Sequence, residues 1–132
     1  MKKLKEFFEK QDRFAKHLGF HIDEMQEGSA TVSATIKEEY LNGADVVHGG
    51  FLFSLADFAF AIASNSNNNL SLGISANILF NKAKSGGKLF AKAKELSDGK
   101  KIATYEVRIS DEEDNTIATF TGTVYRKGMN IV

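Results

Sequence analysis

The chain has 132 residues, which is enough for one domain with a single hydrophobic core. Its 17 basic and 17 acidic side chains balance, so the sequence lacks the basic character of a nucleic-acid-binding protein. It contains no cysteine, which excludes disulfides, thiolate metal ligands and a cysteine nucleophile. Acidic residues interrupt the basic start, and no apolar run is long enough for a membrane span. We therefore expect a cytoplasmic protein that binds neither nucleic acid nor membrane.

Apolar residues in the first segment recur at helical spacing, which predicts a surface helix over residues 2–17. Residues 19–25 form a short and ambiguous first strand, which a turn at residues 27–28 separates from the next one. Residues 30–36 alternate small or polar with apolar side chains, as a half-buried strand does, and a loop is expected over residues 37–47. Four more strands, separated by turn residues, are expected at 72–80, 88–96, 101–110 and 116–126.

Residues 49–66 are apolar on almost every side, rich in alanine and long enough for a helix. A helix without a polar face is buried on most sides. The order of helix, two strands, buried helix and four strands predicts an α+β fold, in which one long antiparallel sheet wraps around a central apolar helix. We expect residues 1–132 to form this single domain, with the first helix on its surface.

Asp57 is the exception within the apolar helix, since it lies among Phe53, Leu55, Phe58 and Phe60. A buried carboxylate is costly unless it is satisfied. A catalytic role explains the residue, and so does an ion pair, a cap or a helix face that meets solvent. Burial would raise the pKa of this carboxyl unless hydrogen bonds to its charged form offset the effect.

His48, Gly49 and Gly50 come directly before this helix. Backbone N–H groups are free at a helix start, where they and the helix dipole can stabilise an oxyanion. A glycine pair is also typical of an ordinary tight turn, and a single histidine is often structural. Gly49 and Asp57 are eight residues apart, about 12 Å along a helix axis. One carbonyl can meet both groups if two antiparallel helices from different subunits lie side by side, which suggests a site shared across a two-fold dimer.

The stretch Asn-Gly-Ala-Asp-Val-Val-His-Gly-Gly-Phe-Leu-Phe-Ser-Leu-Ala-Asp, residues 42–57, resembles the PaaI-like branch of the 4-hydroxybenzoyl-CoA thioesterase superfamily. That branch has the hotdog fold and an Asn, His-Gly-Gly, Asp pattern at this spacing. Residues 77–80 and 118–125 also agree with it. The resemblance implies hydrolysis of an acyl-CoA thioester with no cofactor, coenzyme A being part of the substrate. It also implies a homodimer, and relatives often pair such dimers into homotetramers.

The roles that the resemblance implies are carried over residue by residue. Asp57 would be the nucleophile or, in our preferred interpretation, the general base that activates water. The backbone N–H of Gly49, with a contribution from Gly50, would polarise the thioester carbonyl. Asn42 would position the water or the carbonyl, and His48 would support the oxyanion loop.

Three further residues follow from the resemblance less directly. Ser75 lies where some relatives place a hydroxyl that holds the water or the catalytic carboxylate. Many relatives have an aromatic-Leu-basic-Pro-Ala run after the helix, whereas residues 80–84 of this chain are Phe-Asn-Lys-Ala-Lys and lack the proline. Lys82 and Lys84 keep the basic character and are candidates for binding the phosphates of coenzyme A. Solvated surface lysines are the alternative interpretation.

The phenylalanine-rich helix suits an aryl or medium-chain acyl group, and equally an ordinary core. The three histidines are too scattered to suggest a metal site. Two other functions stay open. A hotdog dehydratase would need a different acid–base pair and would release an enoyl thioester, whereas a non-catalytic acyl-CoA-binding module would bind without turnover.

Overall fold

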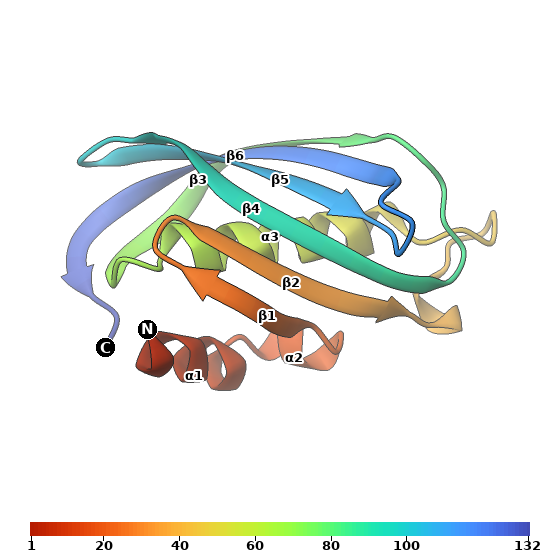
Figure 1. The fold of residues 1–132 in the computed structure, drawn as a ribbon, viewed down its shortest axis with the longest axis horizontal. Coiled ribbons are helices and arrows are strands. Elements are labelled where there is room, and N and C mark those ends of the chain that lie inside the picture. The colour runs from red at the N-terminus through yellow and green to blue at the C-terminus, as the bar shows by residue number, and fades with distance from the viewer.

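A computed structural model describes all 132 residues and shows a six-stranded antiparallel sheet curled around a central helix (Figure 1). The strand order in the sheet is β1-β2-β4-β5-β6-β3. The strands are β1 (His21–Gln26), β2 (Ser29–Ile36), β3 (Asn69–Phe80), β4 (Gly87–Asp98), β5 (Ile102–Ser110) and β6 (Thr116–Asn130). The predicted α+β hotdog fold is therefore confirmed, and the ambiguous first strand predicted at residues 19–25 corresponds to β1.

The central helix α3 (Gly49–Ser64) has one side that reaches the surface. Its other sides pack on the concave face of the sheet and contribute to one core cluster that runs through the domain. The partly or fully exposed residues recur at helical spacing and form a stripe, here called the α3 stripe: Gly49, Gly50, Phe53, Ser54, Asp57 and Ala61. The expectation that this apolar helix is buried on most sides is therefore confirmed, and the stripe is the one side that reaches the surface of the single chain. Neither α3 nor any other helix is long and apolar enough to cross a membrane.

The N-terminal segment forms two short helices, α1 (Lys2–Gln11) and α2 (Arg13–His17), where one continuous helix was predicted. The break lies at Asp12, whose backbone has a ψ of 88° and whose side chain accepts a hydrogen bond from the N–H of Ala15 at 3.0 Å. Asp12 thus ends α1 and caps α2, and the chain changes direction between the two helices. Both helices lie beside β1, and α2 contacts α3 (Figure 1).

Strand β3 is an edge of the sheet and pairs only with β6. Its other edge therefore presents unpaired backbone N–H and C=O groups. Several of its apolar side chains each have more than half of their surface exposed: Leu72, Ile74, Leu79 and Phe80. A long edge strand with exposed apolar side chains is a surface that natural proteins normally cover.

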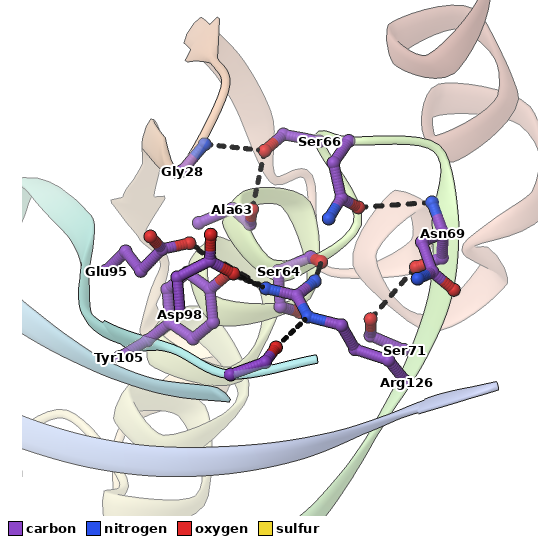
Figure 2. Close-up of polar contacts among 12 residues, drawn as sticks. Gly28, Ala63, Ser64, Ser66, Asn69, Ser71, Glu95, Asp98, Tyr105 and Arg126 are labelled. Carbon is purple, nitrogen blue, oxygen red and sulfur yellow. Dashed lines mark hydrogen bonds and ion pairs between the residues drawn. The ribbon is translucent and has the colours of Figure 1, made fainter. Parts of the chain in front are cut away.

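A buried arginine fixes the C-terminal end of α3, as Figure 2 shows. The guanidinium of Arg126 donates to the carbonyl of Ser64 at 3.4 Å and to the carboxylate of Asp98 at 2.7 Å. It also donates to the hydroxyl of Tyr105 at 3.3 Å. Burial raises the pKa of Tyr105 to about 12, and the hydrogen bond from Arg126 opposes this rise in pKa. A cation at a helix C-terminus is favourable, so this cluster anchors α3 at the end away from Gly49.

Candidate active site

A short loop before α3 is organised by the side chain of Asn42. Its Oδ1 accepts hydrogen bonds from the N–H of Ala44 at 2.9 Å and of Val46 at 3.4 Å. An asparagine side chain that accepts hydrogen bonds from backbone N–H groups a few residues later is typical of a tight turn. The Nδ2 group of Asn42 makes no hydrogen bond within the chain, so it remains available to a ligand or water.

His48 is the N-cap residue of α3. Its Nδ1 accepts a hydrogen bond from the N–H of Gly50 at 2.8 Å, and its own backbone N–H donates to the carbonyl of Tyr40 at 2.8 Å. Since Nδ1 is an acceptor, the neutral imidazole carries its hydrogen on Nε2. A Cβ atom at position 50 would lie 2.9 Å from this Nδ1, which explains the glycine. The N–H of Gly50 is thus engaged, and the prediction that it helps to polarise the substrate is not supported by the geometry.

The N–H of Gly49 has no acceptor within the chain, and it lies at the positive end of α3. The ring of Phe80, at the end of β3, covers this glycine: a Cβ atom at position 49 would lie 3.1 Å from the Phe80 Cζ atom. A free donor at a helix N-terminus, beside an apolar ring, is suited to hold a carbonyl oxygen as negative charge develops on it.

Asp57 lies on the α3 stripe, so its side chain reaches the surface of the single chain. Its apolar surroundings still remove part of its hydration. This partial burial raises the pKa of Asp57 above its ordinary value, and the negative charge of Asp12 raises the pKa further. A carboxylate with a raised pKa is a stronger base than an ordinary aspartate and retains access to a ligand.

Ser75 lies on the opposite face of the sheet from α3. Gly73 faces the helix, because a Cβ atom there would lie 3.2 Å from the ring of Phe60. A β-bulge between Gly73 and Ser75 then shifts the alternation by one residue, so that Ser75 pairs with Thr123 on the outer face, as Asn77 does two residues later. Ser75 therefore does not lie beside Asp57 of the same chain, and its role in the site stays a prediction.

The two candidate lysines differ in their surroundings. Lys82 is exposed and forms no ion pair. Lys84 is half-buried. Its Nζ lies 3.2 Å from the buried carboxylate of Asp111 and 3.8 Å from the exposed carboxylate of Glu112. Of the two lysines predicted as candidates for binding the phosphates, Lys84 is thus engaged by carboxylates and only Lys82 is unpaired; the phosphate contact itself stays a prediction.

A small cleft of about 190 Å³ opens beside the start of α3. His48, Gly50 and Ser54 line one side of it. The rest of the lining is largely apolar and comes from α2 and its C-cap, from the turn before the loop and from α3: Phe14, Leu18, Glu39, Tyr40, Leu41 and Phe51. A larger groove of about 830 Å³ lies on the outer face of the sheet and includes none of the predicted catalytic residues. No group of metal-ligating side chains gathers in either place.

An unbound N–H at a helix start and a basic carboxylate on the exposed side of the same helix are the parts of a hydrolase site. Comparisons with known proteins agree with this class. The family described as the thioesterase superfamily matches residues 44–118. A candidate esterase of Archaeoglobus fulgidus is 45% identical over 127 residues, which is 96% of this chain and 82% of that protein.

The acyl-coenzyme A thioesterase PaaI of Escherichia coli is 39% identical over 121 residues, covering 91% of this chain and 86% of that protein. The solved structure of the Escherichia coli PaaI protein superposes with a TM-score of 0.95 at 36% identity, covering 98% of this chain and 95% of the other. The chain therefore belongs to the thioesterase superfamily and is a thioester hydrolase. The resemblance of residues 42–57 to the PaaI-like branch is confirmed.

Proposed function

We propose that the protein hydrolyses an acyl-CoA thioester to a free acid and coenzyme A, at sites shared between two subunits of a homodimer. The observation that carries the proposal is the presence of a free Gly49 N–H and of Asp57 on the one surface-reaching side of α3. These groups are eight residues apart, or about 12 Å along the helix axis, so that one subunit alone does not bring them to one carbonyl.

A second copy of the chain would complete the site. If two β3 edges pair antiparallel, the sheet continues across the dimer and covers exposed apolar residues such as Leu79. The two α3 helices then lie antiparallel, so that Gly49 of one subunit faces Asp57 of the other. The pairing of dimers into a tetramer stays a prediction from the resemblance.

The reaction needs only water and these groups. The Gly49 N–H holds the thioester oxygen, and Asp57 takes a proton from a water molecule whose oxygen attacks the carbonyl carbon. The tetrahedral intermediate then collapses, the carbon–sulfur bond breaks, and the thiolate leaves and takes up a proton. The free Nδ2 of Asn42 is suited to orient the water or the carbonyl, and His48 supports the loop as its N-cap.

Isotope labelling tests whether an oxygen of Asp57 is transferred to the product. In water enriched in ¹⁸O, general-base catalysis places the label in the product acid in the first turnover. Nucleophilic attack by Asp57 would release the thiolate and form a mixed anhydride; attack of water on the aspartyl carbon of this anhydride would place an unlabelled enzyme oxygen in the first product and leave the label in the carboxylate. We expect the labelled product.

The cleft beside His48 supports an aryl or medium-chain acyl group as the substrate. A cavity of about 150 Å³ lined by apolar side chains accepts benzene, and this cleft of about 190 Å³ is lined by aromatic residues such as Tyr40 and Phe51. The related Escherichia coli PaaI protein comes from a phenylacetic acid degradation operon. Lys82, exposed and unpaired, is the candidate contact for the coenzyme A phosphates.

The test is to measure free thiol and free acid from a panel of aromatic and aliphatic acyl-CoAs. Release of both products supports the proposal, and the panel ranks the acyl groups. An enoyl thioester product would indicate a dehydratase, and tight binding without turnover would indicate a binding module.

Mixing two inactive variants tests the shared site. Asp57→Asn removes the base, and Gly49→Val forces a branched side chain against Phe80. After exchange at equal amounts, half of the dimers are mixed and each has one intact site, so the mixture should recover about a quarter of wild-type activity. A mixture that stays inactive would show that both groups act within one subunit.

A further inference from the structure

The loop between β3 and β4, residues 81–86, supports the loop that leads to Gly49. The N–H of Val47 donates to the carbonyl of Lys84 at 2.7 Å, and the hydroxyl of Ser85 donates to the carbonyl of Asp45 at 2.9 Å. Asp45 has a φ of 60°, a left-handed conformation that is uncommon outside glycine and that aspartate adopts in tight turns. The position of the Gly49 N–H, two residues after the buried Val47, thus depends on where residues 84 and 85 lie.

The side chain of Lys84 is itself fixed by Asp111. The carboxylate of Asp111 is 4% exposed and accepts hydrogen bonds from the backbone N–H of Glu113 at 3.1 Å and of Asn115 at 2.9 Å. It also accepts from the Asn115 side chain at 3.1 Å and from Lys84 at 3.2 Å. Burial alone would raise the pKa of Asp111, but these hydrogen bonds outweigh burial and hold the pKa well below its ordinary value. Asp111 therefore stays charged, and Lys84 keeps a permanent partner.

This environment is unsuited to a phosphate. Any anion that approached the Lys84 ammonium would meet the carboxylates of Asp111 and Glu112, at 3.2 and 3.8 Å from the same nitrogen. If Lys84 turned to a phosphate instead, the buried Asp111 would lose its cation, which is costly. The Lys84 ammonium is therefore bound within the chain, where its ion pair with Asp111 joins the β3–β4 loop to the end of β5.

We propose that Lys84 and Asp111 are positioning residues for thioester hydrolysis. Their ion pair fixes the β3–β4 loop, whose Lys84 carbonyl and Ser85 hydroxyl hold the loop that leads to Gly49 and so place the Gly49 N–H. The inference rests on the proposed function. Because a misplacement of about 1 Å at a reacting centre costs up to about a hundredfold in rate, loss of the pair should lower kcat and leave KM nearly unchanged.

The experiment compares an acyl-CoA with the same acyl group on pantetheine, which lacks the nucleotide and the phosphates. A positioning residue affects both substrates alike, whereas a phosphate contact affects only the acyl-CoA. We expect Lys84→Met to lower kcat about 10- to 100-fold on both substrates by the same factor, and Lys84→Arg to restore most of it. Lys82→Met should instead raise KM for the acyl-CoA. Lys100→Met, in the exposed turn at the far end of β4, is the neutral control.

A rise of KM for acyl-CoA alone in Lys84→Met would overturn the inference and make Lys84 a phosphate contact. Unchanged kinetics on both substrates would also overturn it, since the ion pair would then be structural only. If Lys84→Met does not fold, Ser85→Ala decides, because it removes only the hydrogen bond to Asp45. It should lower kcat several-fold on both substrates, and an unchanged kcat refutes the role. A wild-type protein that cleaves neither thioester would refute the proposed function instead, which is a separate result.

Discussion

His48 offers a sharp test because one hydrogen bond carries its role. Its Nδ1 accepts from the Gly50 N–H at 2.8 Å, while the side chain is otherwise exposed. Loss of an N-cap costs about 1 kcal/mol. At about 2.1 cal/mol/K per residue, unfolding a chain of this length has an entropy of about 0.28 kcal/mol/K. The substitution His48→Ala should therefore lower Tm by about 4 °C.

The matched variant is His48→Asn, because asparagine is among the strongest N-cap residues and its Oδ1 can accept the same N–H. If His48 acts by holding the start of α3, His48→Ala should lower kcat about tenfold through a misplaced Gly49 N–H, and His48→Asn should recover most of this loss. Calorimetry gives the Tm values, and thiol release from a cleaved acyl-CoA gives kcat.

One result would refute this reasoning. His48→Asn could have the Tm of the wild type and still be as slow as His48→Ala. The imidazole would then contact the substrate directly through its Nε2–H, and the cap would be incidental to catalysis.

Three further predictions concern pH and stability. Since burial and then the charge of Asp12 raise the pKa of Asp57, and the base must be ionised, kcat/KM should fall as the pH drops through that raised pKa. Asp12→Asn, which can still cap α2, should move this acidic limb to lower pH; an unmoved limb contradicts the coupling. Gly122→Ala places a Cβ atom 2.7 Å from the buried ring of Phe60 and should cost about 1–3 kcal/mol in urea unfolding, whereas an unchanged midpoint would contradict the packing. Arg126→Met should cost about 1.5–3 kcal/mol with kcat preserved, and a kcat loss at full stability would contradict its structural role.

The fold could be predicted in those segments where the local pattern of apolar and polar residues matches the element that packing in the domain favours. The alternation of residues 30–36 and the apolar segment 49–66 correspond to β2 and α3. The break at Asp12 was missed because the apolar spacing continues on both sides of it, and only the cap shows the new helix. β1 is too short to be evident by itself and depends on its pairing with β2.

The candidate site was predicted in part. Gly49 and Asp57 could be identified because a helix start and a carboxylate among apolar residues are local features. The other assignments depend on contacts that the sequence does not show. A single bulge turns Ser75 to the outer face, and Asp111, which is 27 residues away along the chain, engages Lys84.

The most direct test of the account is the rate of free-thiol release by wild-type protein and by Asp57→Asn, measured on the acyl-CoA that the wild type cleaves fastest. The account predicts cleavage by the wild type and a loss of at least about a hundredfold in the variant, with the folded structure and the assembly unchanged. If Asp57→Asn cleaves as fast as the wild type, Asp57 is not the base, and the central claim is wrong.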